Sequence, residues 1–145
     1  MTATLHLPAT SESRWQTLTA PMLLAAGVLG ASVLLHVRDP HQTGSWGFCP
    51  WLLLTGEYCP GCGGLRAVND LTHGDIGAAV SSNLLFVGSI PLLVFFWGRW
   101  FTDRWNGVRR HTSTRRAFVY AGLFLAVAII FWVVRNLGFA SWLAP

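Results

Sequence analysis

The stretch AFVYAGLFLAVAIIFWVV, residues 117–134, contains no charged side chain and lies between Arg116 and Arg135. A helix needs about 20 mostly apolar residues to cross the hydrocarbon core of a bilayer. The whole chain has 145 residues, of which 52% are hydrophobic and only 11% are charged. A soluble protein of this size could not bury so much apolar surface. The stretch therefore predicts a transmembrane helix, and the composition predicts an integral membrane protein.

Two further apolar stretches, at about residues 18–37 and 84–100, have the same character. They predict an all-α integral membrane protein with three transmembrane helices in a single membrane domain, residues 17–145. Residues 1–16 are polar and show no structural period, which predicts a flexible cytoplasmic tail. Pro91 lies inside the second stretch and is expected to kink that helix, because proline removes a helical hydrogen bond.

The positive charges of the chain are all arginines, and they predict its topology. Residues 99–116 carry Arg99, Arg104, Arg109, Arg110, Arg115 and Arg116 against one acid, Asp103. Short arginine-rich loops stay in the cytoplasm. This predicts a protein of the plasma (inner) membrane with a cytoplasmic amino terminus and an extracytoplasmic cysteine region. Arg135 is expected to extend its side chain to the membrane interface.

All three cysteines lie in one short region, CPWLLLTGEYCPGC, residues 49–62. The apolar run at residues 48–54 is too short to cross the membrane, so it predicts a re-entrant or interfacial segment. After the cysteines, His73-Gly74 predicts a helix end and Asp75 the N-cap of a second short helix. We therefore expect residues 48–83 to form an extracytoplasmic helical hairpin that contains the cysteines.

Arg66 and Asp70 have the i, i+4 spacing at which an ion pair can form on a helix. An arginine close to lipid needs a partner, and Asp70 or Asp75 could supply one. Asn83, at the entry to the second span, is expected to act as a cap or turn residue.

Three chemistries fit the cysteines, and their spacing leaves all three open. The first is a structural disulfide of Cys49 with Cys59 or Cys62. The second is an extracytoplasmic thiol–disulfide oxidoreductase or redox relay, in which the Cys59/Cys62 pair opens a helix and Cys49 resolves the intermediate. The third is a zinc site that uses the three thiolates with His73 as a fourth ligand.

The rest of the sequence lacks the usual signatures of an enzyme. We find no nucleophile–base constellation and no glycine loop suited to phosphate. The leading expectation is a non-enzymatic accessory or interaction protein with a structural cysteine hairpin, and with zinc or no cofactor. Its partners are expected to be membrane lipids and another membrane protein or complex. Nucleic acid is not expected, because the arginines flank apolar stretches instead of forming a solvated face with aromatic residues.

The order of short motifs resembles the domain of unknown function 2752 family of small bacterial membrane proteins. That family has a C-P-x8-C-P-x-C-G pattern followed by Arg-Ala, Gly-Asp and Asn-Pro-Leu, and the resemblance covers residues 48–90. The matching positions besides the cysteines include Pro50, Pro60, Gly63, Arg66, Gly74, Asp75 and Asn83. The chain departs from the pattern at Leu65, where threonine is usual, and at Leu84, where proline is usual. The resemblance implies a membrane protein and no particular activity.

Overall fold

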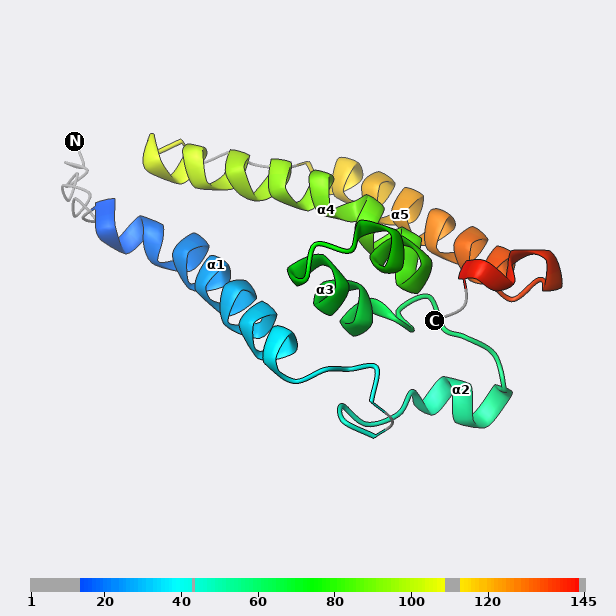
Figure 1. The fold of residues 1–145 in the computed structure, drawn as a ribbon. Coiled ribbons are helices and arrows are strands. Elements are labelled where there is room, and N and C mark those ends of the chain that lie inside the picture. Colours follow the sequence, from blue (N-terminus) through cyan, green and yellow to red (C-terminus); the bar gives the residue numbers. More distant parts are fainter. Residues whose placement is uncertain (1–13, 43, 109–112, 144–145) are drawn as a thin grey trace, which may run out of the picture.

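A computed structural model of the protein describes residues 14–42, 44–108 and 113–143 (Figure 1). The predicted tail at residues 1–16 lies almost entirely outside these ranges. Within them the chain is helical and has no strand. The elements are α1 (Arg14–Val37), α2 (Pro50–Thr55), α3 (Gly64–Thr72), α4 (Ile76–Trp105), α5 (Thr114–Arg135) and a final 3-10 helix, η1 (Gly138–Leu143).

Three of these helices are long and apolar enough to cross a membrane, as predicted. The qualifying segments are Trp15–Val37, Ile76–Trp105 and Thr114–Arg135. Each extends beyond the stretch that was expected from hydropathy, because polar residues at a helix end continue the backbone hydrogen bonds outside the apolar core. The chain thus has the make-up of a multi-pass membrane protein.

The distribution of polar and apolar side chains supports this assignment. Along α1, α4 and α5 most of the large apolar side chains are exposed. The small buried set instead includes the polar residues Asn69, Asp70, Ser82, Asn83 and Arg135. An apolar exterior around a hydrogen-bonded polar interior is the arrangement that lipid favours, because lipid cannot satisfy polar groups.

Helix α4 consists of two helical pieces that meet at Asn83. The backbone of Asn83 is extended, with φ −161° and ψ 93°, whereas Pro91 lies within helical backbone. The Asn83 side chain caps the second piece by accepting a hydrogen bond from the Phe86 amide at 2.9 Å. Asn83 is therefore the predicted cap at the start of the second span, and the main break in α4 is here and not at Pro91.

The hairpin formed by α3 and the start of α4 follows the sequence prediction closely. His73 ends α3, and Gly74 takes the left-handed conformation, with φ 82°, that reverses the chain. The Asp75 carboxylate then accepts from the Ala78 amide at 2.9 Å, as an N-cap does. Inside the hairpin, Ser82 donates a hydrogen bond to the Asp70 carboxylate at 2.9 Å.

The predicted ion pair between Arg66 and Asp70 is wrong. One oxygen of Asp70 accepts from Ser82, and the other lies 3.3 Å from His41 Nε2 in the loop after α1. Asp70 faces the interior of the hairpin, where these partners lie. In the part of the chain that the structure describes, Arg66 takes part in no ion pair.

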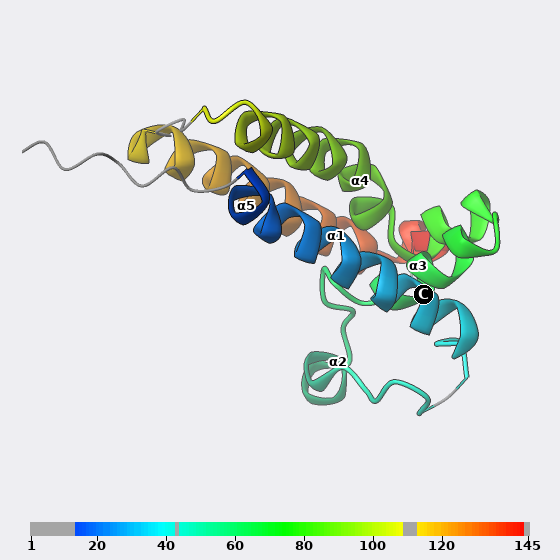
Figure 2. The same cartoon turned by 90° about the vertical axis from the view of Figure 1, so that its left-hand side faces the viewer.

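Helix α3 also packs on the carboxyl end of α1. Asn69 donates to the Leu35 carbonyl at 2.8 Å, which satisfies one of the free carbonyls at the end of α1. The His36 and His73 rings stack, with centroids 4.2 Å apart. The end of α1, helices α2 and α3, and η1 lie together at one end of the molecule, whereas the carboxyl end of α4 and the start of α5 lie at the other (Figures 1 and 2).

Candidate functional site: a three-cysteine cluster

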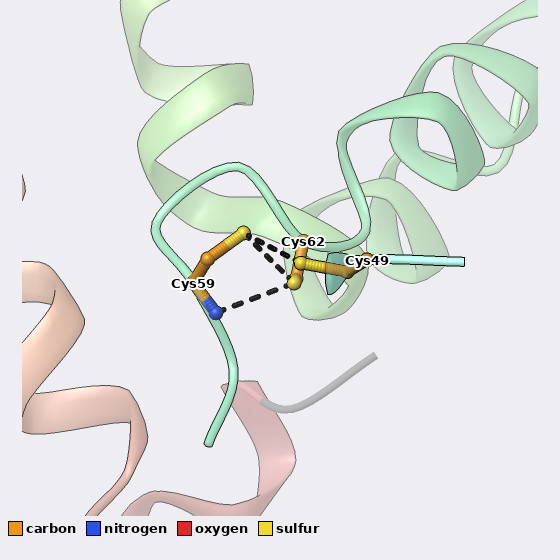
Figure 3. A group of neighbouring side chains, drawn as sticks. All are labelled: Cys49, Cys59 and Cys62. Carbon is orange, nitrogen blue, oxygen red and sulfur yellow. Dashed lines mark hydrogen bonds between the residues drawn. The ribbon is translucent and has the colours of Figure 1, made fainter. Parts of the chain in front are cut away.

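The three cysteines converge on one point between α2 and α3 (Figure 3). The Sγ atoms of Cys59 and Cys62 are 2.9 Å apart, and those of Cys49 and Cys59 are 3.5 Å apart. All three Sγ atoms lie within 4.8 Å of one another. The structure contains them as free thiols, each partly exposed. The cluster therefore joins two segments that are separated by helix α2.

Proline and glycine residues shape the chain around the cluster. Cys49 is the N-cap of α2, with Pro50 in the first turn, where a missing amide proton costs nothing. Gly56 ends α2 in the left-handed conformation, with φ 75°. Cys59 to Cys62 form a tight turn, closed by a hydrogen bond from the Cys62 amide to the Cys59 carbonyl at 3.1 Å. Gly63 then begins α3 with φ 80°, so the cysteine pair opens a helix as predicted.

Helix α4 holds this turn through the side chain of Asn83. The Asn83 amide group donates to the Pro60 carbonyl at 2.9 Å and to the Cys62 carbonyl at 3.0 Å. Asn83 is only 1% exposed, so its side chain makes these hydrogen bonds inside the protein. The same side chain thus fixes both the break in α4 and the conformation of the cysteine turn.

Helix α5 holds the turn from the other side, through Arg135. Its Nη1 donates to the carbonyls of Cys59, at 3.0 Å, and Cys62, at 3.1 Å, and Nη2 donates to the Leu143 carbonyl at 2.9 Å. Arg135 is 2% exposed. The prediction that this arginine extends to the membrane interface is therefore wrong, because the carbonyls of the cysteine turn and of η1 bind it inside the protein.

Asn136, the next residue, clamps the chain just before the cysteine pair. It accepts from the Tyr58 amide and donates to the Tyr58 carbonyl, both at 2.9 Å. Sequence reasoning did not identify Arg135 and Asn136 as part of the site. The available signal was their position: two strong hydrogen-bonding side chains directly follow an apolar span, at the end of the protein where the cysteines were expected.

The thiols differ in their electrostatic environment. The Leu52 amide donates to the Cys49 sulfur and lowers the pKa of that thiol. Burial raises the pKa of Cys62 to about 12, and its hydrogen bonds with the neighbouring thiols act in the same direction. When the thiols of the cluster ionise, Cys49 therefore becomes a thiolate before Cys62 does.

The remaining predicted site residues lie elsewhere. His73 is at the opposite end of α3 from Cys62, and its Nδ1 lies 2.9 Å from the Asn69 carbonyl oxygen. The nine residues of α3, which lie between Cys62 and His73, form a helix about 13 Å long. The structure does not bring His73 to the sulfur atoms, and the cluster of potential metal ligands in the described ranges consists of the three cysteines alone. Arg66, Gly74 and Asp75 belong to the hairpin beyond the cysteine turn.

Comparison with known families agrees with the motif. Residues 49–97 match the family model described as "Protein of unknown function (DUF2752)". This is the family that the order of short motifs resembles. The DUF2752 region includes all three cysteines, α3 and Asn83, whereas Arg135 lies outside it. No curated protein and no solved structure matches the chain.

Proposed function

We propose that this protein is a non-enzymatic accessory protein of the membrane whose cysteine hairpin is fastened by a zinc-class metal ion bound to Cys49, Cys59 and Cys62. One observation carries the proposal: three Sγ atoms from both sides of α2 lie within 4.8 Å of one another. Thiolates are the ligands that structural zinc sites use most. A metal ion held this way would tie the start of α2 to the start of α3.

The distances between the sulfur atoms fit such an ion closely. With Zn–S bonds of about 2.3 Å, two sulfur atoms of a tetrahedral site lie about 3.8 Å apart. The Cys49 and Cys59 Sγ atoms, at 3.5 Å, already have nearly this spacing, and the Cys59 and Cys62 Sγ atoms, at 2.9 Å, would separate by less than ~1 Å on binding. The carbonyl groups of the turn are held by Asn83 and Arg135, so the ligands are largely preorganised.

Metal analysis of the purified protein tests this proposal. We expect about one zinc ion per chain in the wild-type protein, and strong loss of the metal in C49S, C59S and C62S. H73A serves as the matched control and should keep its metal, because His73 lies away from the sulfur atoms. Wild-type protein with no more metal than a C49S/C59S/C62S variant would rule the metal site out.

The accessory role has separate support. Apolar side chains are exposed along all three long helices and also at the cysteine end, where Phe48, Leu54, Phe139 and Trp142 are exposed. Lipid covers such surfaces, and so do the helices of another membrane protein. Copurification from gently solubilised membranes should recover a partner protein. Recovery of the lone chain under several mild detergents would argue against the accessory role.

A second candidate function, a thiol–disulfide relay, is favoured by the 2.9 Å contact between Cys59 and Cys62. In it, the two thiols would lose two protons and two electrons and form one disulfide, while a partner disulfide gains them and becomes two thiols. Cys49, 3.5 Å from Cys59, could resolve a mixed disulfide. With both neighbouring thiols removed, C49S/C62S should then trap a covalent adduct of Cys59 with the partner, which reducing agent releases. Absence of any such adduct in cells would exclude the relay.

Thiol labelling separates the two candidates in the same cells. Thiols that react only after a chelator is added are bound to metal, and thiols that react only after reduction are in a disulfide. Prompt labelling without either treatment would contradict the metal site and would fit the reduced form of the relay.

A further inference from the structure

Among the residues that the structure describes, the buried cation Arg135 has no carboxylate partner. It is 2% exposed, and the atoms that accept its hydrogen bonds are backbone carbonyl oxygens of Cys59, Cys62 and Leu143. Its guanidinium carbon lies 4.9 Å from the ring centre of Phe131 and 5.7 Å from that of Tyr58. The Nε atom is buried and has no hydrogen-bond partner. Carbonyl dipoles and aromatic faces lower the cost of burying this charge, but none of them carries a negative charge.

The acids that the structure describes do not neutralise it. The ion pairs found in the described ranges join His41 to Asp39 and Asp70, and none involves Arg135. Asp75 caps α4, and the Glu57 side chain is exposed. The groups next to Arg135 that can become negative are the thiols of Cys59 and Cys62, whose carbonyls it binds, and the phenol of Tyr58. Of these, only the thiols would become negative by binding a metal ion.

A buried charge requires a counter-charge nearby, because the desolvation cost is otherwise large. Three thiolates around a divalent ion carry a net charge of −1, since −3 and +2 sum to −1. Arg135 brings this sum to zero. A monovalent ion in the same place would leave one uncompensated negative charge, and a trivalent ion one positive charge.

We infer that Arg135 is the counter-cation of the metal–thiolate centre, and that it makes the centre selective for a divalent ion. This inference rests on the proposed metal site. The three cysteine ligands all come from the DUF2752 region, whereas the counter-cation comes from the end of α5, outside that region. Arg135 acts on the metal through its charge and through the turn that it holds, so it is a positioning residue and not a ligand.

The test separates charge from hydrogen bonding at residue 135. R135K keeps the positive charge with fewer donors, whereas R135Q keeps an amide that can donate to the carbonyls and removes the charge. Zinc affinity of the purified, detergent-solubilised proteins is measured by competition with a chromophoric chelator. We expect R135K to bind within about 3-fold of the wild type and R135Q to lose at least about 10-fold, because an uncompensated charge remains in the site.

Ser81 provides the control. S81A removes a hydrogen bond to the Ala78 carbonyl of its own helix without changing the charge, and it should leave zinc affinity within about 3-fold of the wild type. Should R135Q not survive purification, the comparison is made in isolated membranes. There, zinc-dependent protection of the thiols from alkylation should persist in R135K and S81A and be lost in R135Q.

The outcomes are distinguishable. Wild-type protein that binds no zinc overturns the proposed metal site and the counter-cation with it. Wild-type protein that binds zinc together with R135Q that binds equally well overturns the counter-cation alone. Equal loss in R135K and R135Q assigns Arg135 a purely structural part in holding the turn and also overturns the inference.

Discussion

Cys49 and Cys62 belong to one cluster but have opposite electrostatic environments. The Leu52 amide lowers the pKa of Cys49, and burial raises the pKa of Cys62 to about 12. The thiolate is the reactive form, so a lowered pKa gives a larger reactive fraction at neutral pH and a raised pKa a smaller one. In metal-free protein at pH 7, iodoacetamide should therefore modify Cys49 well before Cys62. The reactivity of Cys62 should rise only as the pH approaches 12.

The rates are measured by fragmentation of the tryptic peptide at residues 39–66, which contains all three cysteines. Zinc-loaded protein is the control, because metal-bound thiolates should be protected together. Faster modification of Cys62 than of Cys49 at pH 7 would show that the two environments are assigned the wrong way round.

The Asn83 side chain is small, but its removal should lower the free energy of unfolding strongly. It makes two hydrogen bonds to the cysteine turn and one to the Phe86 amide while it is almost fully buried. We expect N83A to lower the free energy of unfolding by about 3 kcal/mol. The Pro60 carbonyl and the Phe86 amide lose their partner, and the Cys62 carbonyl keeps only Arg135. N83D keeps the cap but sets a buried carboxylate against the two carbonyl oxygens, so it should be at least as destabilising as N83A. The measurement is thermal unfolding in detergent.

The control for Asn83 is Ser81, which bonds only to the Ala78 carbonyl of its own helix at 2.9 Å. S81A should change the stability by less than about 0.5 kcal/mol. A loss in N83A no greater than that in S81A would show that the carbonyls of the turn do not depend on Asn83.

Two aspartates with different surroundings stabilise the α3–α4 hairpin. Asp75 is exposed and caps α4, so D75A should cost about 1 kcal/mol. Asp70 is buried and accepts from Ser82 while it contacts His41, so D70A should cost about 3 kcal/mol. Hydrogen exchange of the α3 amides measures both effects. Equal protection of α3 in the two variants would contradict the assignment of Asp70 to the hairpin interior.

Local signals in the sequence predicted most of these elements. Long apolar runs predicted the three spans, Asp75 and Gly74 predicted the hairpin turn, and the spacing of the cysteines with their glycines predicted a helix opened by Cys59 and Cys62. Each of these features depends on residues close together in the chain. The bounds moved by a few residues, because polar helix ends are not marked by hydropathy.

Contacts between distant segments were beyond such reasoning. Arg135 is separated from Cys59 by 76 residues. An arginine at the end of a span was expected to extend its side chain to the membrane interface. The partners of Asp70 could not be predicted either. Arg66 has the favourable helical spacing, but Asp70 bonds to Ser82 and His41, which are more distant in the sequence. The spacing of residues along a helix fixes which side chains can meet, but packing between helices decides which of them do.

The three long helices separate the cysteine cluster from the carboxyl end of α4 and the start of α5 (Figure 1). The carboxyl ends of α1 and α5 and the start of α4 lie at the end of the molecule that holds α2 and α3, whereas the carboxyl end of α4 and the start of α5 lie at the other end (Figure 1). Each long helix thus runs between the same two ends. Any topology that puts the carboxyl end of α4 on one side of a membrane puts the cysteines, which lie beside α2 and α3, on the other.

We therefore expect the cysteine cluster to be extracytoplasmic and the α4–α5 connection to be cytoplasmic, because arginine-rich loops remain inside. In intact cells treated with reductant and chelator, a membrane-impermeant maleimide should label the wild-type cysteines. In a variant that lacks all three native cysteines, S113C places a thiol at the start of α5 and should react only after the membrane is permeabilised. Labelling of S113C in intact cells, together with no labelling of the cysteines in the wild-type protein, would invert the topology. It would also place the thiols in a reducing compartment, where the metal site would be favoured over a disulfide relay.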